Sequence, residues 1–307
     1  MSLSRTVAVS TSSFAEFSSE PLLLLRQAGL IPRLNPHGRT LTEDEAIALL
    51  AGCVAVAAGT EPLTARLMDA LPDLKVISRC GTGLDNVDLA AAAARGIAVR
   101  HTPDAPTRAV AELALGLALG LLRHIPGMDR DMRNGLWKKR MGGLLADSKV
   151  GIVGLGRIGR ATADLFLALG ARTSFFDPVP PASAAPHAPL DLPDLLSWAD
   201  LISLHAPRPP DNSPLLDAAA IARIKPGAFL INAARGGLVD EDALADALRS
   251  GRLAGAALDV FSREPYQGPL LLTPNTILTP HAGSYARESR ILMETTAIRN
   301  LLEALCP

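Results

Sequence analysis

Short apolar or β-branched runs alternate with longer Ala/Leu-rich segments along most of this chain. This pattern is typical of strands alternating with helices in an α/β fold with a parallel sheet. A first series of strands is expected at Thr6–Val9, Val54–Ala57, Leu74–Ser78 and Ile97–Arg100, with helices near Leu22–Ala28, Asp44–Leu50, Thr64–Leu71 and Leu89–Arg95. A second series of strands is expected at Val150–Val153, Thr173–Phe176, Leu201–Leu204, Phe229–Asn232, Ala254–Asp259 and Thr276–Leu278. Two series of strands predict two parallel sheets.

The segment between the two series differs from both. A long helix is expected at Thr107–Arg123, apolar nearly all round apart from Glu112, and a polar, turn-rich loop at Asp129–Lys149. This discontinuity predicts a domain change near residue 100. A helix that is apolar on all sides is buried between domains or between subunits. The pattern does not separate a contact in a homodimer from a core helix of one chain. Pro178–Pro189, rich in Pro and Ala, is expected to be a surface connection.

Composition indicates a folded protein without an electrostatic reason to bind polyanions. The chain has 307 residues, of which 48% are hydrophobic and 20% charged, and its mean hydropathy is +0.23. This much apolar surface excludes a disordered chain, and the length suggests two domains. Lys and Arg total 30 against 31 Asp and Glu. Neither nucleic acid nor an anionic membrane is therefore expected as a partner.

The sequence predicts a cytoplasmic protein without a metal. The longest apolar stretch, Leu113–Leu122, is far shorter than the roughly 20 residues that cross a bilayer. Met1–Ser13 lacks the apolar core and cleavage site of a secretory signal. Cys53, Cys80 and Cys306 are odd in number and widely spaced, so no disulfide framework is expected. The six histidines are isolated in sequence and show no metal-ligand spacing.

The most informative local pattern is a group of three glycines. Gly154, Gly156 and Gly159 follow the strand-like run Lys149–Val153 and open a helix expected at Ile158–Leu169. In a dinucleotide-binding unit, the first glycine permits a tight turn and the second lets a pyrophosphate approach the backbone. The third allows the helix to pack closely against the strand. The helix N-terminus then binds the anion.

Two charged residues fit the same interpretation. Arg157 stands where the helix dipole disfavours a cation, which is explained if its guanidinium pairs with a phosphate. Asp177 ends the next strand, about 20 residues after the glycines, where an acid accepts hydrogen bonds from the adenosine ribose and repels a 2′-phosphate. This favours NAD over NADP. The alternative is that Asp177 is a turn residue before Pro178.

Three later residues are candidates for the chemistry. Arg235 follows a strand, where its guanidinium is suited to clamping the carboxylate of a 2-oxo or 2-hydroxy acid. His281, also beyond a short strand, is a candidate to move the proton that accompanies hydride transfer. Glu264 is a candidate to hold the second ring nitrogen and keep the imidazole protonated longer. Taken singly, Arg235 is equally compatible with a structural role, and a lone His or a lone Glu is more often structural than catalytic.

In combination, these motifs resemble those of the D-isomer-specific 2-hydroxyacid dehydrogenases. The resemblance covers nearly the whole chain from Leu74 onward, with its motifs in the family's order. Cys80–Asp88 (CGTGLDNVD) is similar to the phosphoglycerate dehydrogenase-like branch in particular. The other matching motifs are GLGRIG at 154–159, NAARGGLVD at 232–240, ALDVF at 257–261 with Glu264-Pro265, and TPHAG at 279–283.

The resemblance implies two Rossmann-like, doubly wound parallel-sheet domains with an active-site cleft between them. Residues 1–100 together with 284–307 are expected to form a discontinuous substrate (catalytic) domain, completed by a last helix at about Ser284–Leu305. Residues 101–283 are expected to form the NAD-binding Rossmann domain. No appended regulatory module is expected after Pro307.

The resemblance also implies a role for each matching residue. In catalysis, His281 matches the acid/base, Glu264 the carboxylate that supports it, and Arg235 the group that binds and orients the substrate. The cofactor-binding matches are Asp259 at the nicotinamide carboxamide, Ala233 and Thr82 along the nicotinamide, Arg157 and Ile158 at the pyrophosphate, and Ala206 and Pro207 over the adenosine side. They join Gly154, Gly156, Gly159 and Asp177. The substrate-binding matches are the backbone cradle of Cys80, Gly81 and Gly83, with Arg79 beside it.

The expected function is NAD-dependent interconversion of a small D-2-hydroxy acid and its 2-oxo acid. The activity would be phosphoglycerate dehydrogenase-like or hydroxypyruvate/glyoxylate reductase-like. The loop Ala57–Glu61 lacks the basic residue of phosphoglycerate-specific members, which argues against a phosphorylated substrate and leaves only Arg79 to meet a phosphate. An alternative on the same fold is an NAD(H)-sensing, corepressor-like interaction protein. A formate-oxidising relative would carry Gln where Glu264 stands.

Overall fold

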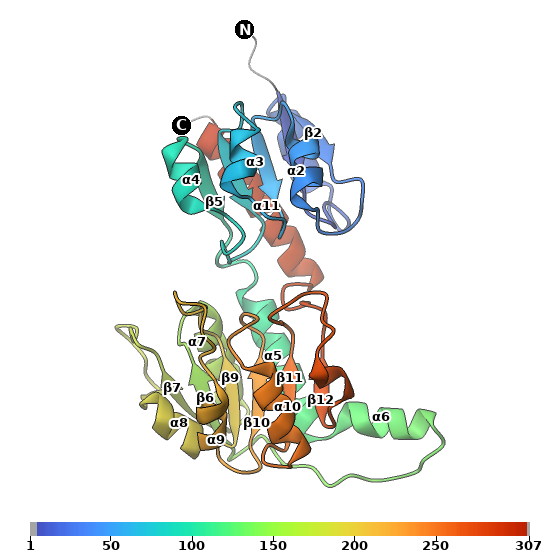
Figure 1. Cartoon of the computed structure of the whole chain (residues 1–307), viewed down its shortest axis with the longest axis vertical. Coiled ribbons are helices and arrows are strands. Elements are labelled where there is room, and N and C mark those ends of the chain that lie inside the picture. The colour runs from blue at the N-terminus through green and yellow to red at the C-terminus, as the bar shows by residue number, and fades with distance from the viewer. Residues whose placement is uncertain (1–4, 306–307) are drawn as a thin grey trace. The chain divides into compact units, whose positions relative to one another are not determined.

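The computed structural model describes residues 5–305, which divide into two compact units, each with its own parallel sheet (Figure 1). The first unit comprises the chain up to Pro106 together with the segment from Ser284 onward, and the second comprises Thr107–Gly283. The chain therefore passes from the first unit to the second a few residues beyond the predicted boundary near residue 100. Hydrogen bonds explain the difference, because Thr102 Oγ1 accepts from the Gly81 N–H at 2.8 Å and the Ala105 carbonyl accepts from the Ser289 hydroxyl at 2.8 Å.

The first unit has a five-stranded sheet in the order β2-β1-β3-β4-β5, with all pairs parallel. Its strands are β1 (Thr6–Val9), β2 (Ile31–Leu34), β3 (Ala55–Ala58), β4 (Val76–Arg79) and β5 (Ala98–His101). Its helices are α1 (Glu20–Gln27), α2 (Glu43–Leu50), α3 (Ala65–Asp69), α4 (Leu89–Ala94) and α11 (Arg287–Leu305). Strand β2 was not predicted from the sequence. It lies at the sheet edge, is mostly exposed and contains Pro32, so it lacks the apolar run of a buried strand.

Helix α11 completes the core of the first unit. Ala297, Ile298 and Leu301 on this helix are buried in one core with Ala55 of β3 and Val76 of β4. A segment from the end of the chain therefore covers the sheet that the beginning of the chain builds.

The second unit has a seven-stranded parallel sheet in the order β12-β11-β10-β9-β6-β7-β8. The strand order reverses beside β6, which pairs with β7 on one side and β9 on the other. Such a reversal is where open α/β sheets place their ligands, at the carboxyl ends of the strands. The strands are β6 (Lys149–Val153), β7 (Arg172–Phe176), β8 (Ala188–Pro189), β9 (Leu201–Leu204), β10 (Phe229–Asn232), β11 (Gly255–Leu258) and β12 (Thr276–Leu278).

Helices cover both faces of this sheet (Figure 1). One face carries α5 (Thr107–Leu122) and α7 (Arg157–Ala168), and the other carries α8 (Leu192–Trp198), α9 (Ala218–Arg223) and α10 (Glu241–Arg249). A 3₁₀ turn spans Pro269–Leu272. Helix α5 buries Ala114, Leu117 and Leu121 in the core formed with α7 and the sheet. It is therefore a core helix of the second unit.

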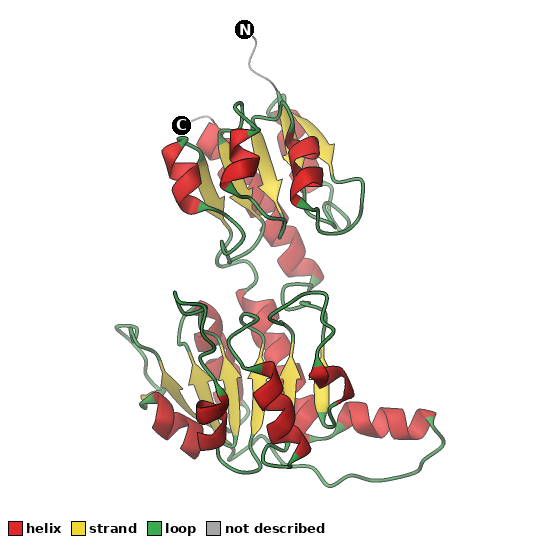
Figure 2. Cartoon of the chain, viewed as in Figure 1, coloured by secondary structure: helices red, strands yellow, loops and turns green. Residues whose placement is uncertain are grey.

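Helix α6 (Ile125–Arg133) corrects the sequence prediction, because its second half lies where a polar loop starting at Asp129 was expected. No residue of α6 is buried, and its apolar positions are few within a mainly polar segment that also contains Pro126 and Gly127, so the sequence pattern indicates a loop. Figure 2 shows α6 extending away from the sheet, followed by a long loop that returns to it.

Within residues 5–305, no single helix has the length and apolar character needed to cross a membrane. In the same range, only α5 and α6 taken as a pair are long and apolar enough, and the two helices are bent by 61° relative to each other. Cys53 and Cys80 are free and buried, and Cys306 lies outside the described residues. No group of His, Cys, Asp and Glu side chains in the same range is arranged to hold a metal ion.

Candidate active site

The second unit brings most of the predicted site residues to one edge of its sheet. All its strands run parallel, so the loops that follow them share the carboxyl edge. Gly154 and Gly156 follow β6, Asp177 follows β7, and Ala206 and Pro207 follow β9. Ala233 and Arg235 follow β10, Asp259 and Glu264 follow β11, and His281 follows β12. Gly159, Arg157 and Ile158 lie in the first turn of α7 at the same edge.

The three glycines after β6 have different reasons to be glycine. Gly154 has φ +92°, and a Cβ there would lie 2.7 Å from the carbonyl oxygen of His205. A Cβ on Gly159 would overlap the carbonyl oxygen of Gly154. A Cβ on Gly156, in contrast, meets no other described part of the chain within 4 Å. The protein's own packing therefore requires Gly154 and Gly159, whereas Gly156 leaves open space that a ligand can approach.

This open space adjoins the N-terminus of α7. Gly156 is the N-cap residue and provides no side-chain cap for the N–H groups of the first turn. Uncapped N–H groups and the positive end of the helix dipole favour an anion. The pyrophosphate of a dinucleotide fits this arrangement, and the residues that would hold it are Gly156, Arg157 and Ile158.

Asp177 links the end of β7 to the glycine-rich loop. Its Oδ2 accepts a hydrogen bond from the Leu155 N–H at 2.8 Å, and its Oδ1 accepts one from the Val179 N–H at 2.9 Å. The bond to Val179 is the contact expected if Asp177 is only a turn residue before Pro178. The bond to Leu155, in contrast, joins the carboxylate to the predicted pyrophosphate-binding loop. A carboxylate has about four lone-pair sites, so Asp177 retains the capacity to accept ribose hydroxyl groups.

His281 and Glu264 form a hydrogen-bonded pair. His281 Nδ1 lies 2.9 Å from Glu264 Oε2, and the side chains are 48% and 39% exposed. The second oxygen of Glu264 accepts from the Phe261 N–H at 3.1 Å. Burial raises the pKa of Glu264, but the imidazole and this N–H outweigh that effect, so the pKa lies below its usual value. Among residues 5–305 no hydrogen-bond partner faces His281 Nε2, which leaves this nitrogen available to a substrate.

The turn that carries His281 is held by Asp259. This carboxylate is 1% exposed and accepts from the Thr279 hydroxyl at 2.5 Å, the Ala282 N–H at 2.7 Å and the Gly283 N–H at 2.8 Å. It thereby stabilises His281 at φ +55°, a conformation that L-residues rarely adopt. This role of Asp259 was not predicted from the sequence. Its signal would have been a lone acid ending a buried strand, and the expected contact of Asp259 with the nicotinamide stays a prediction.

Arg235 lies in a compact turn after β10. The buried Asn232 side chain donates to the Arg235 carbonyl at 2.9 Å and accepts from the Ala234 N–H at 3.1 Å. The Arg235 guanidinium donates to the Ala234 carbonyl at 2.8 Å. Ala233 in the same turn is buried, Ala206 after β9 is half-buried, and Pro207 is exposed.

The remaining predicted residues lie in the first unit, at the carboxyl end of β4. Gly81 has φ +146°, and a Cβ there would overlap the Arg79 guanidinium, which lies against the turn and contacts the Cys80 carbonyl. Burial raises the pKa of the Cys80 thiol to about 12, so it cannot serve as a thiolate nucleophile. The Thr82 hydroxyl donates to the Pro103 carbonyl at 3.4 Å, and Gly83 follows in the same loop.

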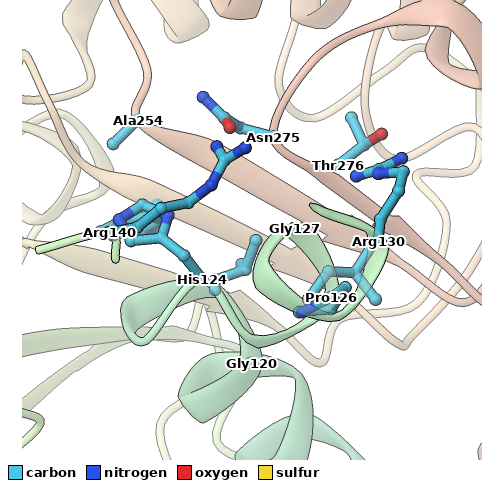
Figure 3. Close-up of a pocket in the computed structure, with 12 residues that line it drawn as sticks. Gly120, His124, Pro126, Gly127, Arg130, Arg140, Ala254, Asn275 and Thr276 are labelled. Carbon is cyan, nitrogen blue, oxygen red and sulfur yellow. The ribbon is translucent and has the colours of Figure 1, made fainter. Parts of the chain in front are cut away.

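Two hollows of the second unit lie away from these residues. They have volumes of about 40 and 370 Å³, and both are lined by Arg130 and Arg140 near α6. Figure 3 shows the smaller one. The smaller hollow is also lined by Phe229 and Thr276, the first residues of β10 and β12. It therefore lies at the amino edge of the sheet, opposite the His281–Glu264 pair.

Comparison with known proteins agrees with the geometry of the second unit. Residues 115–283 match the family model described as D-isomer specific 2-hydroxyacid dehydrogenase, NAD binding domain. The chain is 44% identical over 232 residues to D-3-phosphoglycerate dehydrogenase of Mycobacterium tuberculosis, an alignment covering 74% of this chain and 44% of that protein. The chain thus spans less than half the length of this curated relative.

Solved structures resemble the chain over nearly its full length. The TT0316 protein of Thermus thermophilus is 39% identical with a TM-score of 0.91, and the match covers 98% of this chain and 96% of that one. A glyoxylate reductase of Paecilomyes thermophila is 28% identical with a TM-score of 0.87, covering 99% and 96% of the two chains. Given the matched domain, the shared fold and the dinucleotide-binding edge, this chain belongs to the D-isomer specific 2-hydroxyacid dehydrogenase family and takes NAD as its cofactor.

Proposed function

We propose that the protein catalyses the NAD-dependent interconversion of a small D-2-hydroxy acid and its 2-oxo acid. The observation that carries this proposal is the 2.9 Å hydrogen bond between His281 and Glu264 at the carboxyl edge of a dinucleotide-binding sheet. A supported imidazole with its second nitrogen open to a ligand is suited to moving one proton. Hydride transfer at a carbinol or ketone needs that proton transfer.

Each residue has a task in the reducing direction. NADH held at Gly156, Arg157 and Ile158 would supply the hydride for C2 of the 2-oxo acid. The Arg235 guanidinium binds the substrate carboxylate and polarises the ketone. His281 Nε2–H donates its proton to the carbonyl oxygen, where negative charge develops. Glu264 accepts the Nδ1–H hydrogen bond, which orients the ring and stabilises its protonated form before transfer. In the oxidising direction His281 accepts the hydroxyl proton.

The names of the relatives suggest two classes of substrate, phosphorylated and unphosphorylated. The protein similar over 74% of this chain is named a phosphoglycerate dehydrogenase, and one of the similar structures is named a glyoxylate reductase. In this chain the loop Ala57–Glu61 contains no cation, and Glu61 is buried. These features support a small, unphosphorylated 2-oxo acid such as glyoxylate or hydroxypyruvate.

A substrate panel tests the proposal. NADH oxidation is followed by its absorbance with glyoxylate, hydroxypyruvate, pyruvate and 3-phosphohydroxypyruvate, and the configuration of any chiral product is determined. We expect turnover with at least one of these acids and a D product from hydroxypyruvate or pyruvate. NADH binding without turnover of any acid would contradict the proposal and would favour a cofactor-sensing protein.

We further propose that the protein is a cytoplasmic homodimer. The dimer is supported by an apolar arm, which we define as α6 and the loop to Leu144. Its exposed large apolar side chains are Ile125, Met132, Leu136, Trp137, Met141 and Leu144, and Trp137 and Met141 are 83% and 94% exposed. So large an exposed apolar group is typical of a protein–protein contact. The buried, free thiols of Cys53 and Cys80 are compatible with a reducing compartment.

Light scattering of the purified protein tests the dimer. We expect the mass of two chains for the wild type and of one chain for a Trp137→Glu, Met141→Glu double variant. A wild-type protein that stays monomeric at micromolar concentration would contradict the dimer.

A further inference from the structure

Arg208, which the proposed mechanism does not use, joins two loops of the candidate site. It lies in the loop after β9, and its Nε–H donates to the carbonyl oxygen of Gly236 at 2.5 Å. Gly236 lies in the loop after β10, the strand paired with β9. Within residues 5–305, Arg208 makes no ion pair with a carboxylate. Its charge is therefore directed at a backbone carbonyl one residue after Arg235.

The turn is shaped to receive this guanidinium. Gly237 has φ +76°, and a Cβ there would lie 2.7 Å from Arg208 Nη2. A Cβ on Gly236 would overlap the carbonyl oxygen of Phe261 in the neighbouring loop after β11. Two consecutive glycines thus let the turn fit between the Arg208 guanidinium and the Phe261 backbone. Any side chain at either position would push the turn away from one of these neighbours.

We propose that Arg208 is a positioning residue that fixes the turn carrying Arg235. The proposal rests on the proposed function, in which Arg235 binds the substrate carboxylate. The Asn232 side chain holds the Arg235 carbonyl at 2.9 Å, and Arg208 holds the next carbonyl along the chain. Together they fix both peptide groups that follow the Arg235 side chain. A hydrogen bond from a guanidinium is stronger than a neutral one, so its loss loosens the turn.

The kinetic test compares Arg208→Ala and Arg208→Lys with Arg223→Ala, which removes an exposed arginine from α9 of the same unit. For Arg208→Ala we expect KM for the 2-oxo acid to rise about tenfold, equivalent to about 1.4 kcal/mol, while the Kd for NADH stays unchanged. The Arg208→Lys side chain still carries a donor, so its KM for the 2-oxo acid should lie between those of the wild type and Arg208→Ala. Added guanidine should lower the KM of Arg208→Ala. A raised Kd for NADH would assign Arg208 to the cofactor and overturn the proposal.

Hydrogen–deuterium exchange tests the same idea without relying on activity. We expect faster exchange in peptides spanning residues 232–240 of Arg208→Ala, with no change in Arg223→Ala and no loss of global Tm. Unchanged exchange in this segment would overturn the positioning role even if the enzyme is active. Conversely, absence of turnover in the wild type would overturn the proposed function while the exchange result still reports on Arg208.

Discussion

Replacing Glu264 with Gln provides a sensitive test of the proton-transfer pair. The carboxylate oxygen lies 2.9 Å from His281 Nδ1, and the pKa of Glu264 is lowered because the imidazole and the Phe261 N–H outweigh burial. Glutamine has nearly the same shape and its carbonyl oxygen still accepts the Nδ1–H hydrogen bond. It lacks the negative charge that stabilises the imidazolium. In the reducing direction the protonated ring is the active form, so activity should be lost at a lower pH in the variant.

The geometry sets the size of this effect. Two unit charges 2.9 Å apart in a water-like medium interact by about 1.4 kcal/mol, which corresponds to about one pH unit. The water-like limit applies because the side chains are 48% and 39% exposed. Salt screens such a pair further. We therefore expect the alkaline limb of the kcat/KM profile to move toward acid by about 0.5–1 unit.

The assay is the pH dependence of kcat/KM for NADH-dependent reduction of the best 2-oxo acid. At the acid end of the profile the variant should retain most of its activity, because there the ring is protonated in both proteins. Asp246→Asn, which removes a 79% exposed charge from α10 of the same unit, serves as the matched control. A profile that does not move, with the control also unchanged, would refute the electrostatic role of Glu264.

Three further substitutions or modifications test other parts of the account. Asp177→Ala should weaken NADH binding at least tenfold and reduce the preference for NADH over NADPH; a wild type that prefers NADPH would contradict the ribose argument. Burial raises the pKa of Glu61, so the folded protein loses stability as pH rises from about 4.5 through the raised pKa. The Tm of Glu61→Gln relative to wild type should therefore increase from pH 4.5 to pH 8, whereas a constant difference would contradict it. Because burial raises the pKa of Cys80 to about 12, iodoacetamide at pH 8 should leave Cys80 unmodified in the folded protein and modify it after denaturation, as mapped by mass spectrometry.

The sheets were predictable from sequence because most of their strands are buried on both faces. Val150–Val153 and Leu201–Leu204 are near-continuous apolar runs, as expected of parallel strands between two layers of helices. Strand β2 and helix α6 were missed for the opposite reason. Both are largely exposed, and neither contains the run of apolar residues that marks a buried element.

The candidate site was partly predictable for a related reason. The carboxyl ends of parallel strands converge, so residues that follow different strands, such as His281 and Glu264, were expected at one edge. What the pattern could not supply is the direction of each side chain. Asp259 is turned inward to hold the His281 turn, and Arg208 is turned toward the Gly236 carbonyl. Both contacts join residues from different loops, and no spacing in the sequence encodes them.

The most direct test of the central claim is turnover by His281→Ala measured together with NADH binding. Loss of the proton donor should lower kcat/KM for the 2-oxo acid by about 10²–10⁴-fold, while the Kd for NADH, followed by its fluorescence, stays within twofold of wild type. Turnover that persists near the wild-type rate would show that His281 does not carry the proton and would contradict the proposed mechanism.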